Sequence, residues 1–162
     1  MIRYSKQSDL GQIQELIWLS FGDRPSALED LENRYLVYEV DSKIVALTGL
    51  YTKTEFINGL EIDWTCTHPD YRQKGYMQEL FEELLRNITC NVYCSCWRLE
   101  EKDRVNLQTL MNIFGFEEVL KPRVIWSSTY NCKCNKNQHL CVNYKKGCKC
   151  YEDLYLRKGI IK

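Results

Sequence analysis

The stretch Thr67-His68-Pro69-Asp70-Tyr71-Arg72-Gln73-Lys74-Gly75-Tyr76-Met77 joins a β-rich run to the clearest helix in the chain. Pro69 ends the strand, because proline has no N–H to donate to a sheet. Gly75 permits a close backbone approach, and the free amides of residues 73–77 at a helix start form a nest for anions such as pyrophosphate. The stretch predicts an anion site with Arg72 and Lys74 at its rim. The alternative is an ordinary strand–turn–helix with two solvated cations.

The elements around this turn predict an α+β domain. A continuous apolar stripe favours a helix over 75–88. Further helices are expected from Asp9, with Gln12 completing a capping box, over 25–34 and over 101–113, where Gly115 ends the helix. The expected strands cover 2–5, 35–40, 44–51, 60–67, 90–97, 116–127 with a break near Pro122, and 151–157. A tight turn at Asp41-Ser42 is expected to join 35–40 to 44–51. This pattern predicts one domain, 1–162, with a mixed, mostly antiparallel twisted sheet of six to seven strands and about four helices.

Composition excludes several classes of function. The chain has 162 residues, and its 22 basic and 22 acidic side chains give a formal net charge of zero. No global field therefore attracts nucleic acid or an anionic membrane. The N-terminal stretch is polar, and nowhere do 18 apolar residues follow one another, so we expect a cytoplasmic protein with no membrane partner.

The same turn resembles motif A of the GNAT superfamily of N-acetyltransferases, usually V-x-P-x-[YF]-R-x-[KR]-G-[IY]-[GA]. The signature [QR]-x-x-G-x-[GA] corresponds to Arg72, Gly75 and Met77, and Met77 departs from the small residue that is usual there. The resemblance continues through Asp9–Leu16, Ile44–Tyr51 and Leu107–Phe116. It implies a GNAT-like sheet and acetyl-CoA as cosubstrate. By this resemblance the cofactor-binding residues are Thr65, Cys66 and Thr67 along the pantetheine arm, and Arg72, Gln73, Lys74, Gly75, Tyr76 and Met77 at the pyrophosphate.

Two carboxylates are candidates for the general base that acetyl transfer to an amine requires. Alternation along 60–67 puts Glu61 and Asp63 on one face of an otherwise apolar strand, where they are costly unless they line a cleft. Glu61 lies 11 residues before Arg72, as the glutamate base does in histone-acetylating relatives. Glu61 is therefore the first candidate and Asp63 the second, and the alternative is that both are structural acids.

The acid that protonates the departing thiolate is not evident. Relatives carry a tyrosine a few residues before the terminal Gly-Phe of their fourth helix, and Met111 stands at that position. Tyr76, Tyr93, Tyr130 or solvent are the substitutes that the sequence offers. His68 precedes a proline at a strand end, which favours turn capping over catalysis.

Five of the nine cysteines lie in the polar segment 128–150. Their pattern is Cys132-x-Cys134-x6-Cys141-x6-Cys148-x-Cys150, with lysines and asparagines between them. Such a segment cannot form an apolar core, and a tetrahedral Zn²⁺ held by four thiolates would order it. We expect a structural zinc site formed by four of the five, with His139 as an outside candidate. Redox-active thiols, a disulfide or an iron–sulfur cluster are the alternatives.

Together these features predict an acetyl-CoA-dependent N-acetyltransferase that acts on a primary amine of a small molecule or a protein by direct attack. The alternative is a non-catalytic acetyl-CoA-binding sensor or adaptor with a zinc-stabilised interaction loop. The sequence identifies neither the acceptor nor the oligomeric state, a homodimer included.

Overall fold

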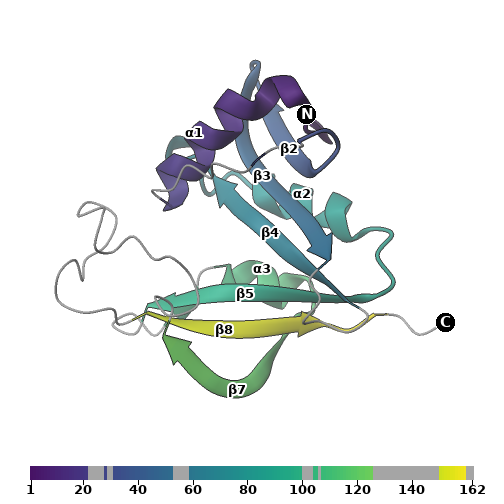
Figure 1. Cartoon of the computed structure of the whole chain (residues 1–162), viewed down its shortest axis with the longest axis vertical. Helices are drawn as coiled ribbons and strands as arrows, with labels where there is room; N and C mark the ends of the chain where they lie inside the picture. The colour runs from purple at the N-terminus through teal and green to yellow at the C-terminus, as the bar shows by residue number, and fades with distance from the viewer. Residues whose placement is uncertain are drawn as a thin grey trace. The chain divides into compact units, whose positions relative to one another are not determined.

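The computed structural model describes residues 1–21, 28, 31–52, 59–99, 104–105, 107–125 and 150–159. Three α-helices and eight β-strands lie within these residues (Figure 1). The helices are α1 (Leu10–Phe21), α2 (Tyr76–Leu85) and α3 (Gln108–Ile113). The strands are β1 (Ile2–Tyr4), β2 (Tyr35–Val40), β3 (Lys43–Thr52), β4 (Gly59–Thr67), β5 (Asn91–Leu99), β6 (Arg104–Val105), β7 (Glu117–Ile125) and β8 (Cys150–Arg157). No described helix has the length and apolar content that a membrane span needs.

The strands form one mixed sheet in the order β1-β2-β3-β4-β5-β8-β7, and β6 pairs with β5 off this path. β4 and β5 are parallel over Gly59–Glu61 and Asn91–Tyr93, whereas the pairs β1–β2, β2–β3, β5–β8 and β7–β8 are antiparallel. The predicted α+β class, with a mostly antiparallel sheet, is therefore confirmed.

Residue contacts divide the chain into two compact units. The first contains residues 1–52 and 62–89, and the second contains residues 53–61 and 90–162. The boundary falls inside β4, between Glu61 and Ile62. The prediction of a single domain over 1–162 stays a prediction.

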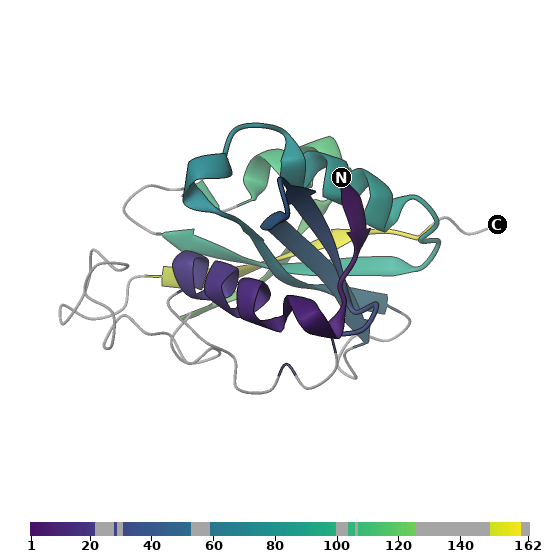
Figure 2. The same ribbon diagram turned by 90° about the horizontal axis from the view of Figure 1, so that it is seen from above.

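In the first unit, α1 and α2 cover opposite faces of the strands (Figure 2). The apolar stripe of α1, with Ile13, Leu16 and Ile17, packs against one face. On the other face, Leu80 of α2 packs with Leu36 and Ala46. Alternation along β2 supplies both layers, because successive side chains of a strand point to opposite sides.

The turn between β2 and β3 is the predicted two-residue turn at Asp41-Ser42. Both residues have positive φ, 48° and 63°, and Val40 pairs with Lys43 across the turn. Left-handed conformations at both central positions match the right-handed twist of the hairpin. This hairpin brings Lys43 beside the end of β4, where His68 N donates to Val45 O at 2.8 Å.

In the second unit, β5 is paired with β8 from Val92 opposite Arg157 to Leu99 opposite Cys150. The register of β7 against β8 shifts between Val119 and Val124. The predicted break near Pro122 therefore falls at an irregularity, as expected for a residue without an N–H to donate.

Three local expectations differ from the structure. Residues 32–34 form a turn, so the predicted second helix does not reach Arg34, and half of 25–34 lies outside the described residues. The helix expected over 101–113 begins only at Gln108, because Arg104–Val105 pairs with β5 instead. The side chains of the expected Asp9–Gln12 capping box have other partners: Asp9 accepts from Lys6 N and Arg3, and Gln12 Oε1 accepts from Ile44 N at 2.9 Å.

Candidate functional site

The turn before α2 has the backbone shape that an anion site requires. Gln73 and Gly75 have positive φ of 63° and 83°, and Gly75 is the N-cap of α2. A Cβ at Gly75 would meet no atom within 4 Å. Glycine is therefore favoured at this position by the left-handed backbone rather than by lack of space.

The first turn of α2 leaves amides available to a ligand. The first hydrogen bond of the helical ladder runs from Glu79 N to Gly75 O at 3.1 Å. The amides of residues 75–78 precede it, and helix geometry gives them no acceptor within the helix. Together with the positive end of the helix dipole, they form a site suited to phosphate oxygens.

Two charged side chains, Arg72 and Lys74, lie at the rim of this turn. Arg72 Nε donates to Thr67 O at 3.3 Å, which ties the turn to the end of β4. Lys74 Nζ lies 4.8 Å from the centre of the Tyr71 ring. The side chains of Tyr76 and Met77 pack against the core cluster of Leu36, Ala46 and Leu80. Met77, the departure from the family pattern, therefore contributes to this core.

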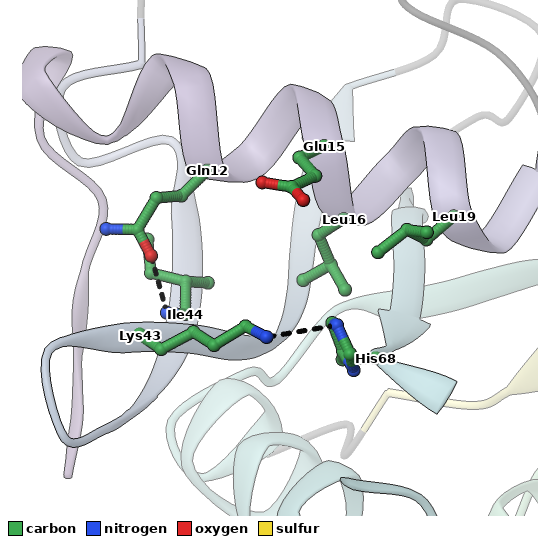
Figure 3. A pocket seen from close by; sticks show the side chains of 7 residues that line it. All are labelled: Gln12, Glu15, Leu16, Leu19, Lys43, Ile44 and His68. Carbon is green, nitrogen blue, oxygen red and sulfur yellow. Dashed lines mark hydrogen bonds between the residues drawn. The ribbon is translucent and has the colours of Figure 1, made fainter. Parts of the chain in front are cut away.

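His68 caps the segment that leads into the turn, as predicted. Its Nδ1 accepts from Asp70 N at 3.3 Å, and its Nε2 lies 3.1 Å from Lys43 Nζ (Figure 3). The adjacent cavity between α1 and the start of β3 has a volume of about 20 Å³, which is room for about one water molecule. This cavity is too small for a substrate.

Asp63 is held by three donors. Its Oδ2 accepts from the Tyr35 hydroxyl at 2.9 Å and lies 3.5 Å from an Arg34 guanidinium nitrogen, and its Oδ1 accepts from Trp64 N at 2.9 Å. Burial raises the pKa of Asp63, and these donors oppose the rise. Burial, with the nearby Asp63 charge, also raises the pKa of Tyr35. A carboxylate bound in this way anchors β2 to β4.

Strict alternation along β4 fails next to Asp63. Trp64 has a φ of 24°, which is uncommon for a non-glycine residue. Trp64 packs on the core cluster beneath α1, and its neighbour Asp63 contacts Tyr35 of that same cluster. Adjacent residues of a regular strand would face opposite sides. The expectation that Asp63 and Trp64 lie on opposite faces is therefore wrong at this point.

Glu61 lies in the second unit and is 3% exposed. Its Oε1 accepts from the Ser95 hydroxyl at 2.8 Å. Ser95 and Tyr35 were not among the predicted site residues, because the arrangement of the paired strands brings each to its carboxylate. The alternation of side chains along β5 and β2 can be read from the sequence. The strand registers that bring Ser95 to Glu61 and Tyr35 to Asp63 cannot.

The described cysteines fall into two groups. Cys66, Cys94 and Cys96 are buried free thiols, and Cys90 is an exposed one. Burial raises the pKa of Cys66 to about 12. The Cys94 thiol, 3.6 Å away, and burial together raise the pKa of Cys96. Cys66 and Cys96 therefore stay protonated at neutral pH and are poor nucleophiles.

The position of the usual thiol-protonating tyrosine is apolar and closed. Met111 is fully buried in α3. Of the substitutes, Tyr76 stacks on Tyr38 with ring centres 4.4 Å apart, and the Tyr93 ring lies 2.5 Å from where a Cβ at Gly59 would be. Tyr130 lies outside the described residues.

The predicted zinc ligands cannot be placed. Cys132, Cys134, Cys141 and Cys148 lie outside the described residues, as does His139, and only the backbone of Cys150 is described, at the start of β8. Within the part of the chain that the structure describes, no group of three or more His, Cys, Asp or Glu side chains could hold a metal ion. The zinc site stays a prediction.

Solved structures with the same fold include several acetyltransferases. The ribosomal-protein-S18-alanine N-acetyltransferase of Escherichia coli matches with a TM-score of 0.69 at 12% identity, over 100% of this chain and 95% of that one. An aminoglycoside 6'-N-acetyltransferase complexed with coenzyme A matches with a TM-score of 0.68 at 12% identity, over 100% and 98%. The N-acetylglutamate synthase of Neisseria gonorrhoeae, complexed with coenzyme A and N-acetyl-glutamate, matches with a TM-score of 0.63 at 14% identity. This chain spans 35% of that enzyme.

None of the curated proteins compared with the chain matches it. The model of the Acetyltransferase (GNAT) family matches residues 6–104, which include α1, β2–β5, α2 and the turn before α2. The match covers more than half of the 162 residues. With the sheet order and the left-handed turn at Gly75, it shows that the chain belongs to the GNAT family of acetyltransferases.

Proposed function

We propose that this protein transfers an acetyl group from acetyl-CoA to a primary amine by direct attack of the amine on the thioester. The observation that carries the proposal is the turn before α2. Gln73 and Gly75 of this turn are left-handed, and the amides at the start of α2 have no acceptor within the helix. Arg72 and Lys74 lie at the rim of the turn. A diphosphate matches this arrangement in charge and geometry.

Acetyl-CoA would bind along β4 and at the turn. The pyrophosphate would accept from the amides of Gln73, Lys74, Gly75, Tyr76 and Met77. The pantetheine arm would pair with the backbone of Thr65, Cys66 and Thr67, which follow the three β4 residues that pair with β5. Coenzyme A is present in the structures of two relatives described above, which supports the choice of cosubstrate.

Glu61 would act as the general base, through an intervening water. The amine nitrogen forms a bond to the thioester carbon, the carbon–sulfur bond breaks, and one amine proton passes to the base. The departing coenzyme A thiolate takes a proton from solvent or from a tyrosine such as Tyr93. Asp63 is the second candidate for the base, but Tyr35, Arg34 and the Trp64 amide already bind its oxygens.

Direct attack by the amine is favoured over a mechanism in which Cys66 is first acetylated. Cys66 lies on the strand that would hold the pantetheine arm, but its pKa is raised to about 12 by burial. The thiolate is the nucleophile in thioester exchange, and a pKa of about 12 leaves about one part in 10⁵ ionised at pH 7.

The first test combines binding and turnover. We expect calorimetry to detect coenzyme A, and thiol release from acetyl-CoA to rise with at least one member of a panel of amino acids, polyamines, aminoglycosides and N-terminal peptides. Coenzyme A binding without transfer to any member of the panel would support a non-catalytic sensor or adaptor. Absence of both would overturn the proposal.

The second test concerns the base. Glu61→Gln keeps the shape of the side chain and removes its basicity. We expect kcat to fall by about 10²–10⁴ with little change in the Kd for acetyl-CoA. Asp63→Asn is the matched variant on the same strand. We expect it to lower the midpoint of thermal unfolding, and to lower kcat less than Glu61→Gln does. Unchanged turnover in Glu61→Gln would remove Glu61 from the mechanism.

A further inference from the structure

Glu61 has a partner from a distant part of the chain. Ser95 Oγ donates to Glu61 Oε1 at 2.8 Å, across 34 residues of sequence. Glu61 lies opposite Tyr93 in the parallel ladder between β4 and β5. Ser95, two residues further along β5, is on the same face as Tyr93. The contact is therefore diagonal, within the reach of a glutamate side chain.

The strand that carries Ser95 is held on both edges. β5 pairs with β4 over Asn91–Tyr93 and with β8 from Val92 to Leu99, where Ser95 is opposite Leu154. A hydroxyl on such a central strand has few backbone motions available, so it constrains the group that it binds. Groups on strands hold their positions better than groups on loops.

The carboxylate that Ser95 binds is 3% exposed. A buried charge requires hydrogen-bond donors, and a donor to one oxygen also limits rotation of the carboxylate about its last bond. For a general base this orientation matters, because proton transfer depends on the direction of the accepting lone pair.

We infer that Ser95 is a positioning residue for Glu61: its hydroxyl orients the carboxylate that removes the amine proton. The inference rests on the proposed function, in which Glu61 is the base. Ser95 acts through Glu61 and itself exchanges no proton with the substrate. Its removal should therefore lower kcat and leave acetyl-CoA binding unchanged.

The test uses Ser95→Ala and Ser95→Thr in the full chain, with the amine of the panel that gives the fastest thiol release. We expect Ser95→Ala to lower kcat about tenfold, as the loss of one hydrogen bond to a charged group predicts, with the KM for acetyl-CoA unchanged. Ser95→Thr keeps the hydroxyl and suits a strand, so it should recover most of the turnover.

The control lies on the same strand. Cys94 is the neighbouring residue of β5 and faces the opposite side, beside Cys96. Cys94→Ala removes one side-chain atom, as Ser95→Ala does, and we expect it to leave kcat unchanged. Thermal unfolding of each variant separates a general loss of stability from a loss of positioning.

A double variant distinguishes the inference from the proposal on which it rests. If Ser95 acts through Glu61, Ser95→Ala should have no further effect on kcat in the Glu61→Gln background. An equal effect in both backgrounds, wild-type kcat in Ser95→Ala, or no recovery in Ser95→Thr would overturn the role of Ser95 while Glu61 remains the base. Wild-type kcat in Glu61→Gln would instead overturn the base assignment, and the role of Ser95 with it.

Discussion

At the scale of single residues, the two candidate bases differ in how the protein holds them. Glu61 is bound by a neutral hydroxyl from Ser95. Asp63 is bound by Tyr35, by the Trp64 amide and, at 3.5 Å, by Arg34, and burial raises its pKa. Three hydrogen-bond donors stabilise the ionised form of a carboxylate in its position, which makes it a weaker proton acceptor. The three donors therefore suit Asp63 to anchor β2 to β4, and Glu61 stays the proposed base.

A pair of glycines tests the turn. Gly75 has a φ of 83°, so Gly75→Ala forces an L side chain into a left-handed conformation, at a cost of about 1–2 kcal/mol. We expect calorimetry to show a Kd for coenzyme A that is about tenfold higher. The physical reason is that the backbone relaxes away from the shape that aims the amides.

Gly11 provides the matched control. It lies within α1, and a Cβ there would meet nothing within 4 Å. Gly11→Ala should raise the free energy of unfolding by about 0.5–1 kcal/mol and leave the Kd for coenzyme A unchanged. Equal Kd values for Gly75→Ala and the wild type would show that the turn does not bind the diphosphate.

At the scale of elements, one ion-pair network joins β1 to the start of α1 and to β2. Arg3 binds both oxygens of Asp9, at 2.7 and 3.0 Å, and Glu39 at 2.7 Å. Asp9 also accepts from Lys6 N at 2.8 Å. The hydrogen bonds from Arg3 hold the pKa of Asp9 below its usual value of 3.8. Asp9 therefore serves this network in place of the expected Asp9–Gln12 capping box.

The network makes stability depend on pH in a defined direction. Because the pKa of Asp9 is lowered on folding, its contribution is complete above a pH of about 4 and is lost as pH falls through the folded pKa. We expect Asp9→Asn to lower the free energy of unfolding by about 2 kcal/mol at pH 7, and by less at pH 3. Urea unfolding at the two pH values measures the difference. Glu82→Gln, on the exposed face of α2, should show no such dependence, and an unchanged deficit at pH 3 would contradict the argument.

At the scale of the whole molecule, the zinc site of the cysteine-rich segment is a prediction that the intact chain can test. Native mass spectrometry of the full chain, recorded with and without acetyl-CoA, should show one Zn²⁺ and one coenzyme per chain, and it reports the oligomeric state in the same spectrum. Cys148→Ser should lose the metal, because a four-thiolate site lacking a ligand is weakened. Cys90→Ser, at an exposed free thiol, should keep it. A wild-type spectrum without metal would rule out the zinc site.

The sequence by itself determined the features that depend on neighbours in the chain. Pro69, Gly75 and the apolar stripe of α2 predicted the strand end, the turn and the helix, and the Asp41-Ser42 pair predicted the hairpin. These features are local, because backbone conformation and helical periodicity depend on residues a few positions apart. The start of α3 was misplaced because Arg104–Val105 pairs with β5, a contact that local pattern does not encode.

Only the tertiary structure decided the partners of the charged groups. Ser95 reaches Glu61 across 34 residues, Tyr35 reaches Asp63 across 28, and Arg3 reaches Glu39 across 36. Each contact depends on which strands pair and in what register, and a shift of one residue would turn each side chain to the other face. The sequence therefore identified Glu61 as the candidate base, and strand register determined that Ser95 binds it.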